Sequence, residues 1–137
     1  RKRGAKMDSA HGKQICVDYI KCNFSAERDG VWMLELMRQA VKNANVREVH
    51  SHVEEFTGVQ SPPGFAAVVL LDESHVSAHC YYEKGLLAVD AFTCGGGDPN
   101  EIITFIHERL ISEMKEIKEI SKNEIKRFRY GHINEGL

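Results

Sequence analysis

The feature that most constrains the fold is a continuous apolar run at residues 65–71 (FAAVVLL), which polar residues follow at once. Such a run without polar alternation is typical of a central strand that is buried on both faces or at an interface. Two prolines and a glycine in residues 60–64 (QSPPG) predict a loop leading into it. Residues 72–75 (DESH) then end the strand with acid, hydroxyl and imidazole groups. Because burying such groups without partners is costly, their place beside the core suggests a chemical role.

The remaining segments show two kinds of periodicity. Residues 31–43 have apolar positions at helical spacing, and a second helix is expected from about 100 to near 118, with Asp98 as N-cap and Pro99 in its first position. Strand patterns occupy the other periodic segments, which are 13–22, 46–56, 76–82, 86–93 and 124–130. The charged residues of 115–126 suggest a solvated face at helical spacing.

The resulting order, β-α-β-β-β-β-α-β, predicts an α+β fold. Consecutive strands with short turns favour antiparallel pairing, so we expect a two-layer sandwich, mainly antiparallel sheet with two helices on one face. The other sheet face would stay open. A second copy could cover it, which suggests a homodimer.

Length and charge narrow the possible partners. A chain of 137 residues points to one domain, and a net charge of −2 gives no attraction to nucleic acid or anionic membranes. We expect a disordered basic tail over 1–12 and a single domain over 13–137. No apolar stretch approaches the roughly 20 residues of a membrane helix. A cytoplasmic protein without nucleic-acid or membrane partners is therefore expected.

Cysteine and histidine spacing argues against a metal site. The cysteines at 16, 22, 80 and 94 form no Cys-x-x-Cys pair, so reduced thiols are expected, with at most one of them reactive. The spacing of His75 and His79 suits zinc on a helix, but Val76 and Ala78 between them favour a strand. No metal is therefore predicted.

The residues whose side chains could take part in a reaction cluster in 70–95 (LLDESHVSAHCYYEKGLLAVDAFTCG). A turn at Lys84 and Gly85 would fold this segment into a hairpin. Strand ends about ten residues on either side of the turn then become neighbours, so Ser74 and Cys94 can lie close together.

Glu73-Ser74-His75, then His79 and Glu83, then 88–95 (AVDAFTCG) resembles the processing region of the short prokaryotic S-adenosylmethionine decarboxylases. The resemblance covers about 26 residues. It implies self-cleavage between residues 73 and 74, which turns Ser74 into a covalent pyruvoyl cofactor that forms a Schiff base with a small-molecule amine substrate. It also implies that His79 assists processing.

The same resemblance assigns further roles. Cys94 matches the family's proton donor, and Glu83 matches a carboxylate that holds ribose hydroxyls. Phe56 matches an aromatic residue that stacks on adenine, and Tyr81 keeps an aromatic surface where the family has tryptophan. The family's sites lie at a dimer interface. The implied function is S-adenosylmethionine decarboxylation, which supplies the aminopropyl donor for spermidine biosynthesis.

Two departures leave alternatives open. The family pattern His-Thr-Trp-Pro-Glu is here residues 79–83 (HCYYE), and the serine that assists processing eight residues before the cleavage serine is here Ala66. A decarboxylase of L-ornithine or L-arginine with the same cofactor is one alternative. An uncleaved, non-catalytic regulatory relative is the other.

Overall fold

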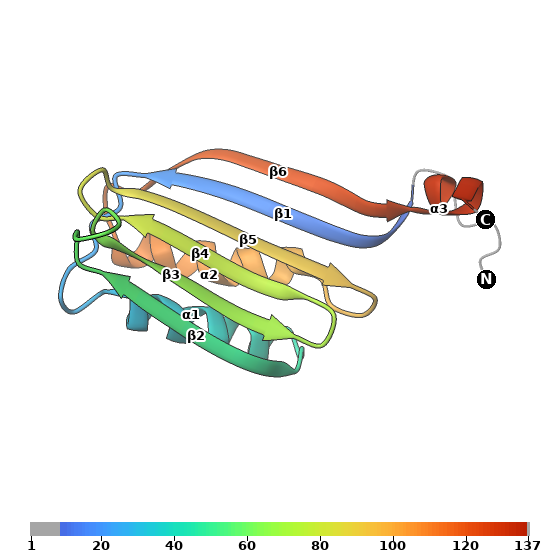
Figure 1. The fold of residues 1–137 in the computed structure, drawn as a ribbon, viewed down its shortest axis with the longest axis horizontal. Coiled ribbons are helices and arrows are strands. Elements are labelled where there is room, and N and C mark those ends of the chain that lie inside the picture. The colour runs from blue at the N-terminus through green and yellow to red at the C-terminus, as the bar shows by residue number, and fades with distance from the viewer. Residues whose placement is uncertain (1–8, 137) are drawn as a thin grey trace.

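The computed structural model describes residues 9–136, which form a β-sheet with helices packed against it (Figure 1). The strands are β1 (Ala10–Ile20), β2 (Glu48–Phe56), β3 (Gly64–Leu71), β4 (His75–Tyr81), β5 (Leu86–Cys94) and β6 (Lys118–Arg129). The helices are α1 (Gly30–Asn43), α2 (Pro99–Glu113) and α3 (Tyr130–Gly136). The strands form one sheet in the order β2-β3-β4-β5-β1-β6, and all neighbours are antiparallel.

Helices α1 and α2 both pack on the same face of the sheet (Figure 1). Local sequence explains where each begins. Asp29 caps α1 by accepting a hydrogen bond from the Trp32 amide at 3.1 Å, and Asp98 caps α2 through the Asn100 amide at 2.9 Å. Pro99 occupies the first turn of α2, as predicted. The α+β prediction, a largely antiparallel sheet with two helices on one face, is confirmed.

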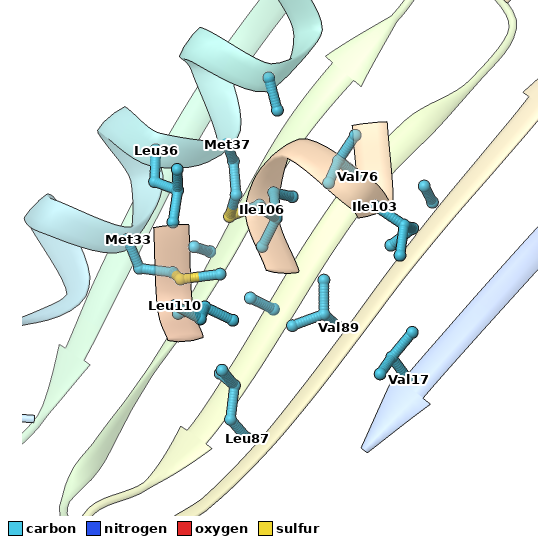
Figure 2. Close-up of a cluster of buried hydrophobic side chains, with 14 of the residues drawn as sticks. Val17, Met33, Leu36, Met37, Val76, Leu87, Val89, Ile103, Ile106 and Leu110 are labelled. Carbon is cyan, nitrogen blue, oxygen red and sulfur yellow. The ribbon is translucent and has the colours of Figure 1, made fainter. Parts of the chain in front are cut away.

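The core lies between this helix pair and the sheet (Figure 2). Met33 and Met37 of α1 and Ile106 and Leu110 of α2 are each at most 1% exposed and face the inward side chains of the strands, such as Val89. Burying a side chain of this size stabilises the fold by about 1.5–3 kcal/mol. This core fixes which face of β4 and β5 looks away from the helices.

The C-terminal third differs from the sequence prediction. Helix α2 ends at Glu113 rather than near 118, and β6 extends over twelve residues where a strand was expected only over 124–130. The predicted helical spacing of charges in 115–126 was wrong because Met114 and Ile117 are buried and β6 pairs along the length of β1. Tertiary pairing thus outweighed local propensity. Helix α3 was not predicted.

The N-terminal boundary also moves. Strand β1 begins at Ala10, so residues 10–12, predicted to be disordered, belong to the sheet. Of the rest of the predicted tail, residues 1–8 lie outside the described residues. Gly12 pairs with Cys94 of β5 on one side and with Arg127 of β6 on the other. The strand therefore reaches the end of β5, where the candidate chemistry lies.

The sheet face opposite α1 and α2, which we call the open face, mixes apolar and polar groups. Leu70, Tyr81 and Ile125 are each between 43% and 45% exposed on it. The side chains of His75 and Asp90 lie on the same face, because they alternate with the buried Val76 and Val89. Within residues 9–136, no helix is long and apolar enough to cross a membrane.

Candidate active site

The Glu73–Ser74 bond lies in a tight turn at one end of the sheet. Strands β3 and β4 are joined through Asp72, Glu73 and Ser74, and the Leu71 amide donates to the Ser74 carbonyl at 2.9 Å. This hydrogen bond closes a two-residue hairpin loop across which the polar residues are displayed. The polar interruption after the apolar run is therefore the turn itself.

Cys94 meets this turn from the neighbouring strand. It is the last residue of β5, and its backbone amide donates to the Ser74 hydroxyl oxygen at 3.2 Å. Strands β4 and β5 pair from His75 opposite Phe92 to Tyr81 opposite Leu86, so the hairpin brings residues 74 and 94 together across 20 positions of sequence. The serine and the cysteine thus share one end of the sheet.

Three loops enclose a pocket of about 460 Å³ beside these two residues. They are the α1–β2 connection at 44–47, the β3–β4 turn at 72–74, and the segment at 93–97. The first and third loops touch, since a side-chain carbon on Gly97 would lie 3.0 Å from Val46. The Thr93 hydroxyl donates to the Gly97 carbonyl at 2.9 Å and holds the glycine-rich segment in place. The pocket is therefore built by one chain.

Cys94 keeps its proton in this setting. Burial raises the pKa of the Cys94 thiol, the negative charge of Glu73 raises it further, and the positive charge of Arg127 acts in the opposite direction. A thiol with a raised pKa is protonated at neutral pH. It can therefore serve as a proton donor to a group bound beside Ser74.

Gly12 is a site residue that the sequence analysis missed. It pairs with Cys94, and a side-chain carbon at this position would lie 2.9 Å from the Cys94 sulfur and 3.1 Å from the Thr93 carbonyl oxygen. Only glycine leaves this space for the thiol. The available signal was a glycine directly before a strand pattern, but it fell inside the segment predicted to be disordered.

The other predicted site residues lie toward the opposite end of the sheet. His79 is five residues beyond Ser74 along β4, which is about 16 Å at the rise of an extended strand. Phe56 pairs with Gly64, which pairs in turn with Tyr81, and Glu83 follows two residues later. None of these four side chains lines the pocket beside Ser74. One chain therefore brings Glu73, Ser74 and Cys94 together but keeps His79, Tyr81, Glu83 and Phe56 apart from them.

His79 stands between two small residues on the open face. It pairs with Ala66 of β3 and with Ala88 of β5, and it is exposed. The position where the family has an assisting serine is therefore the direct cross-strand neighbour of His79. Neither alanine fills the space beside the imidazole, so the ring is accessible from the open face.

A hydrogen-bond network centred on Asp90 separates the two groups. Asp90 accepts from the Ser77 hydroxyl and from Gln14 Nε2 at 2.8 Å, and its Oδ2 lies 2.9 Å from His75 Nε2. Arg127 Nη1 donates to Gln14 Oε1 at 2.6 Å. Of these residues only His75 was considered from sequence, as a possible zinc ligand, although an aspartate within the apolar segment 86–93 was a usable signal.

The network shifts the pKa values of both His75 and Asp90. The hydrogen bond to Asp90 raises the pKa of His75, against the lowering effect of burial. Burial alone would raise the pKa of Asp90, but the hydrogen bonds from His75, Ser77 and Gln14 outweigh it and lower the pKa. The pair therefore favours an aspartate beside an imidazolium.

Tyr82, one of the departures from the family pattern, points away from the open face. Its hydroxyl donates to Glu55 Oε1 at 2.8 Å, and Glu55 Oε2 accepts from the Gly30 amide at 2.7 Å at the start of α1. Tyr82 also packs on Phe24 and Phe65. It therefore anchors α1 to the sheet and forms no wall of the pocket beside Ser74.

Comparison with known proteins identifies the family of this chain. The family model described as S-adenosylmethionine decarboxylase matches residues 13–123. The S-adenosylmethionine decarboxylase proenzyme of Pyrococcus horikoshii is 30% identical over 81% of this chain and 78% of its own length. That of Clostridium botulinum is 28% identical over 83% of this chain and 96% of its own length.

A solved structure gives the same relationship. The crystal structure of the adenosylmethionine decarboxylase from Aquifex aeolicus superposes with a TM-score of 0.65 and 32% sequence identity, covering 88% of this chain and 92% of that one. The matched region includes the β3–β4 turn, the end of β5 and the strands that carry both groups of residues. The chain belongs to the S-adenosylmethionine decarboxylase family.

Proposed function

We propose that the chain is a proenzyme that cuts its own backbone between Glu73 and Ser74 and then decarboxylates S-adenosylmethionine. The observation that carries the proposal is the contact between the Cys94 amide and the Ser74 hydroxyl, 3.2 Å apart across β4 and β5. It supports the proposal because the residue proposed to become the cofactor and the residue proposed as proton donor line the same pocket. Family membership supplies the reaction class, and the geometry supports the residue roles.

The cleavage conserves atoms without an external oxidant. The Ser74 hydroxyl oxygen attacks the Glu73 carbonyl carbon, and the bond from that carbon to the Ser74 nitrogen breaks, which leaves an ester and a free amine. Loss of the Ser74 α-proton then breaks the bond between Cβ and Oγ, so that Glu73 leaves as a carboxylate and residue 74 becomes dehydroalanine. Water replaces its nitrogen, ammonia departs, and a pyruvoyl group remains on residue 74.

The chain's residues fit this group, because the serine that would form it borders a pocket and contacts Cys94. When present, the pyruvoyl group supplies a conjugated carbonyl that accepts the electrons released as CO2 leaves the substrate. Cys94, with its raised pKa, holds the proton that the substrate's α-carbon needs afterwards. Glu83, Tyr81 and Phe56 are proposed to hold the nucleoside part of the substrate.

We infer that a second copy of the chain completes the site. In one chain His79 is about 16 Å from Ser74 by strand rise, which is too far for proton transfer. A two-fold axis that packs two open faces together, with strand directions reversed, would set the Ser74 end of one sheet over the His79 end of the other. A closed two-fold dimer would then hold two complete sites. The exposed Leu70 and Tyr81 on this face support such packing.

The first experiment is intact-mass measurement of the purified protein, followed by release of labelled CO2. We expect two fragments, 1–73 and a pyruvoyl-started 74–137, and CO2 from S-adenosylmethionine. Release from ornithine or arginine instead would change the substrate. A single full-length mass after long incubation would support the uncleaved regulatory alternative and contradict the proposal.

The second experiment tests the dimer with two inactive variants that carry different tags. Alone, Ser74→Ala and His79→Ala should each stay largely uncleaved. When the two are produced together, the His79→Ala chain should be cleaved, because its Ser74 meets the intact His79 of the other variant. Cleavage of His79→Ala alone at the wild-type rate would remove the role of His79, and an uncleaved mixture would contradict the shared site.

A further inference from the structure

A bidentate ion pair between Arg47 and Asp72 joins the turn that carries the Glu73–Ser74 bond to the α1–β2 loop. Arg47 Nε donates to Asp72 Oδ2 at 3.3 Å, and Arg47 Nη2 donates to Asp72 Oδ1. A guanidinium that binds both carboxylate oxygens fixes the direction of its partner as well as its distance. Asp72 is the residue directly before Glu73, so this pair acts next to the bond that is proposed to break.

The chain places Arg47 opposite this turn by local structure. Asn45 follows α1 with φ +60, a left-handed conformation that asparagine tolerates at a helix end. The reversal leads into β2, whose first residue Glu48 pairs with Leu71 at the end of β3. Arg47 and Asp72 are the next residues outward from that pair. Their contact therefore continues the β2–β3 register beyond the last strand residues.

Among the neighbouring charged residues, Arg38 forms ion pairs with Glu48 and Glu35. Arg38 Nε lies 2.9 Å from one oxygen of Glu48 and 3.2 Å from the other, and Arg38 Nη1 donates to Glu35 at 2.9 Å. Arg38 thus binds Glu48, the acidic residue next to Arg47 in sequence. It is an exposed arginine of the same α1–β2 region that binds two carboxylates without contacting the turn, which makes it a matched control.

Charge at the pocket also favours a role in processing. Among the described residues that line the pocket, Arg47 is the only cation, and Asp72 and Glu73 are the two acids. Self-cleavage adds a third carboxylate, because the Glu73 carbonyl becomes a chain end. A cation held beside the turn offsets the negative charge that builds up during ester elimination.

We propose that Arg47 is a positioning residue for self-cleavage. Through Asp72 it holds the β3–β4 turn so that the Ser74 hydroxyl stays at the Cys94 amide, and it balances the carboxylate that cleavage produces. This inference rests on the proposed self-cleavage. It concerns a residue outside the turn that acts on the bond through Asp72.

The test follows cleavage of the full-length chain by intact mass during cell-free synthesis. Arg47→Ala should slow cleavage by about fivefold at low salt, the factor that an exposed ion pair of good geometry supports. The difference should shrink near 1 M salt, where the Debye length is about 3 Å. Arg38→Ala should cleave at the wild-type rate, because it loses comparable ion pairs away from the turn.

The exchanged pair Arg47→Asp with Asp72→Arg separates positioning from folding. It should recover most of the wild-type rate, and Arg47→Ala with Asp72→Ala should be no slower than Arg47→Ala alone. Wild-type cleavage by Arg47→Ala, or an exchanged pair slower than either single variant, would overturn the role of Arg47 alone. A wild-type chain that never cleaves would overturn the proposed function as well.

Discussion

The two ends of the open face are built differently. At one end, Ser74 and Cys94 lie beside a pocket that three loops of the same chain enclose. At the other end, His79 and Tyr81 are exposed, and His79 is flanked by Ala66 and Ala88. The first end is complete within one chain, whereas the second displays its groups outward. This difference is what the proposed two-fold assembly requires, because the exposed groups of one copy would then face the pocket of the other.

The largest effect is expected at Ser74, the residue on which the first end depends. Ser74→Ala removes the nucleophile, so both self-cleavage and CO2 release should fall to background. Ser77→Ala is the matched control, because Ser77 lies three residues further on, within β4, and donates to Asp90 instead of bordering the turn. Intact mass should show one species for the first variant and two for the second. Two fragments from Ser74→Ala would place the cleavage elsewhere.

Cys94→Ala should separate the two activities at the same end. The serine and the turn remain, so the fragments should still form, while turnover should fall by about 10²-fold or more, the range for losing a positioned proton donor. The comparison variant is Cys16→Ala, a half-buried cysteine further along the sheet that contributes no atom to the pocket. Unchanged CO2 release by Cys94→Ala would end its assignment as proton donor.

A smaller effect, an increase in the rate of self-cleavage, is expected from Ala66→Ser at the other end of the open face. The β3–β4 register sets residue 66 directly opposite His79, so a hydroxyl there can hydrogen-bond the imidazole across the strands. We expect self-cleavage to accelerate a few-fold. The control is Ala88→Ser, which adds a hydroxyl on the opposite side of His79. Slower cleavage in Ala66→Ser would show that the space beside His79 is needed empty.

Much of the fold could be predicted because its signals were local. The apolar run of β3, the cap Asp98 and the glycine-containing turn at Lys84 and Gly85 each act within a few residues. The failures occurred where distant pairing decided the structure. Charged residues after Glu113 fit a helix as well as a strand, and only β1 shows which one forms.

The candidate site divides in the same way. Hairpin geometry places Ser74 beside Cys94, because a single turn relates them. The separation of His79 from Ser74 also follows from strand rise, although the family resemblance had grouped all these residues into one site. Gly12 and Arg127 were missed, since each reaches the site from a strand far away in sequence.

The smallest effect concerns the Asp90 network between the two ends. The hydrogen bond to Asp90 raises the pKa of His75 above its usual 6.5, so this interaction stabilises the fold fully below pH 6.5 and loses that contribution as pH rises through the raised value. The pKa of Asp90 is lowered, so its contribution holds above pH 3.8 and is lost as pH falls further.

His75→Gln in a Ser74→Ala chain, which stays in one piece, tests this pair by urea unfolding. Its destabilisation should be larger at pH 6 than at pH 8.5, by less than about 1 kcal/mol, because the His75 side chain is 35% exposed. When Asp90→Asn is already present, the destabilisation caused by His75→Gln should no longer depend on pH, since the imidazolium that is lost then had no carboxylate partner. If His75→Gln costs the same free energy at both pH values, the charge on His75 adds nothing to the fold. The network would then act only through its neutral hydrogen bonds. Because a covered open face would shield the pair from solvent, a pH effect that grows with protein concentration would also indicate that the two ends meet in a dimer.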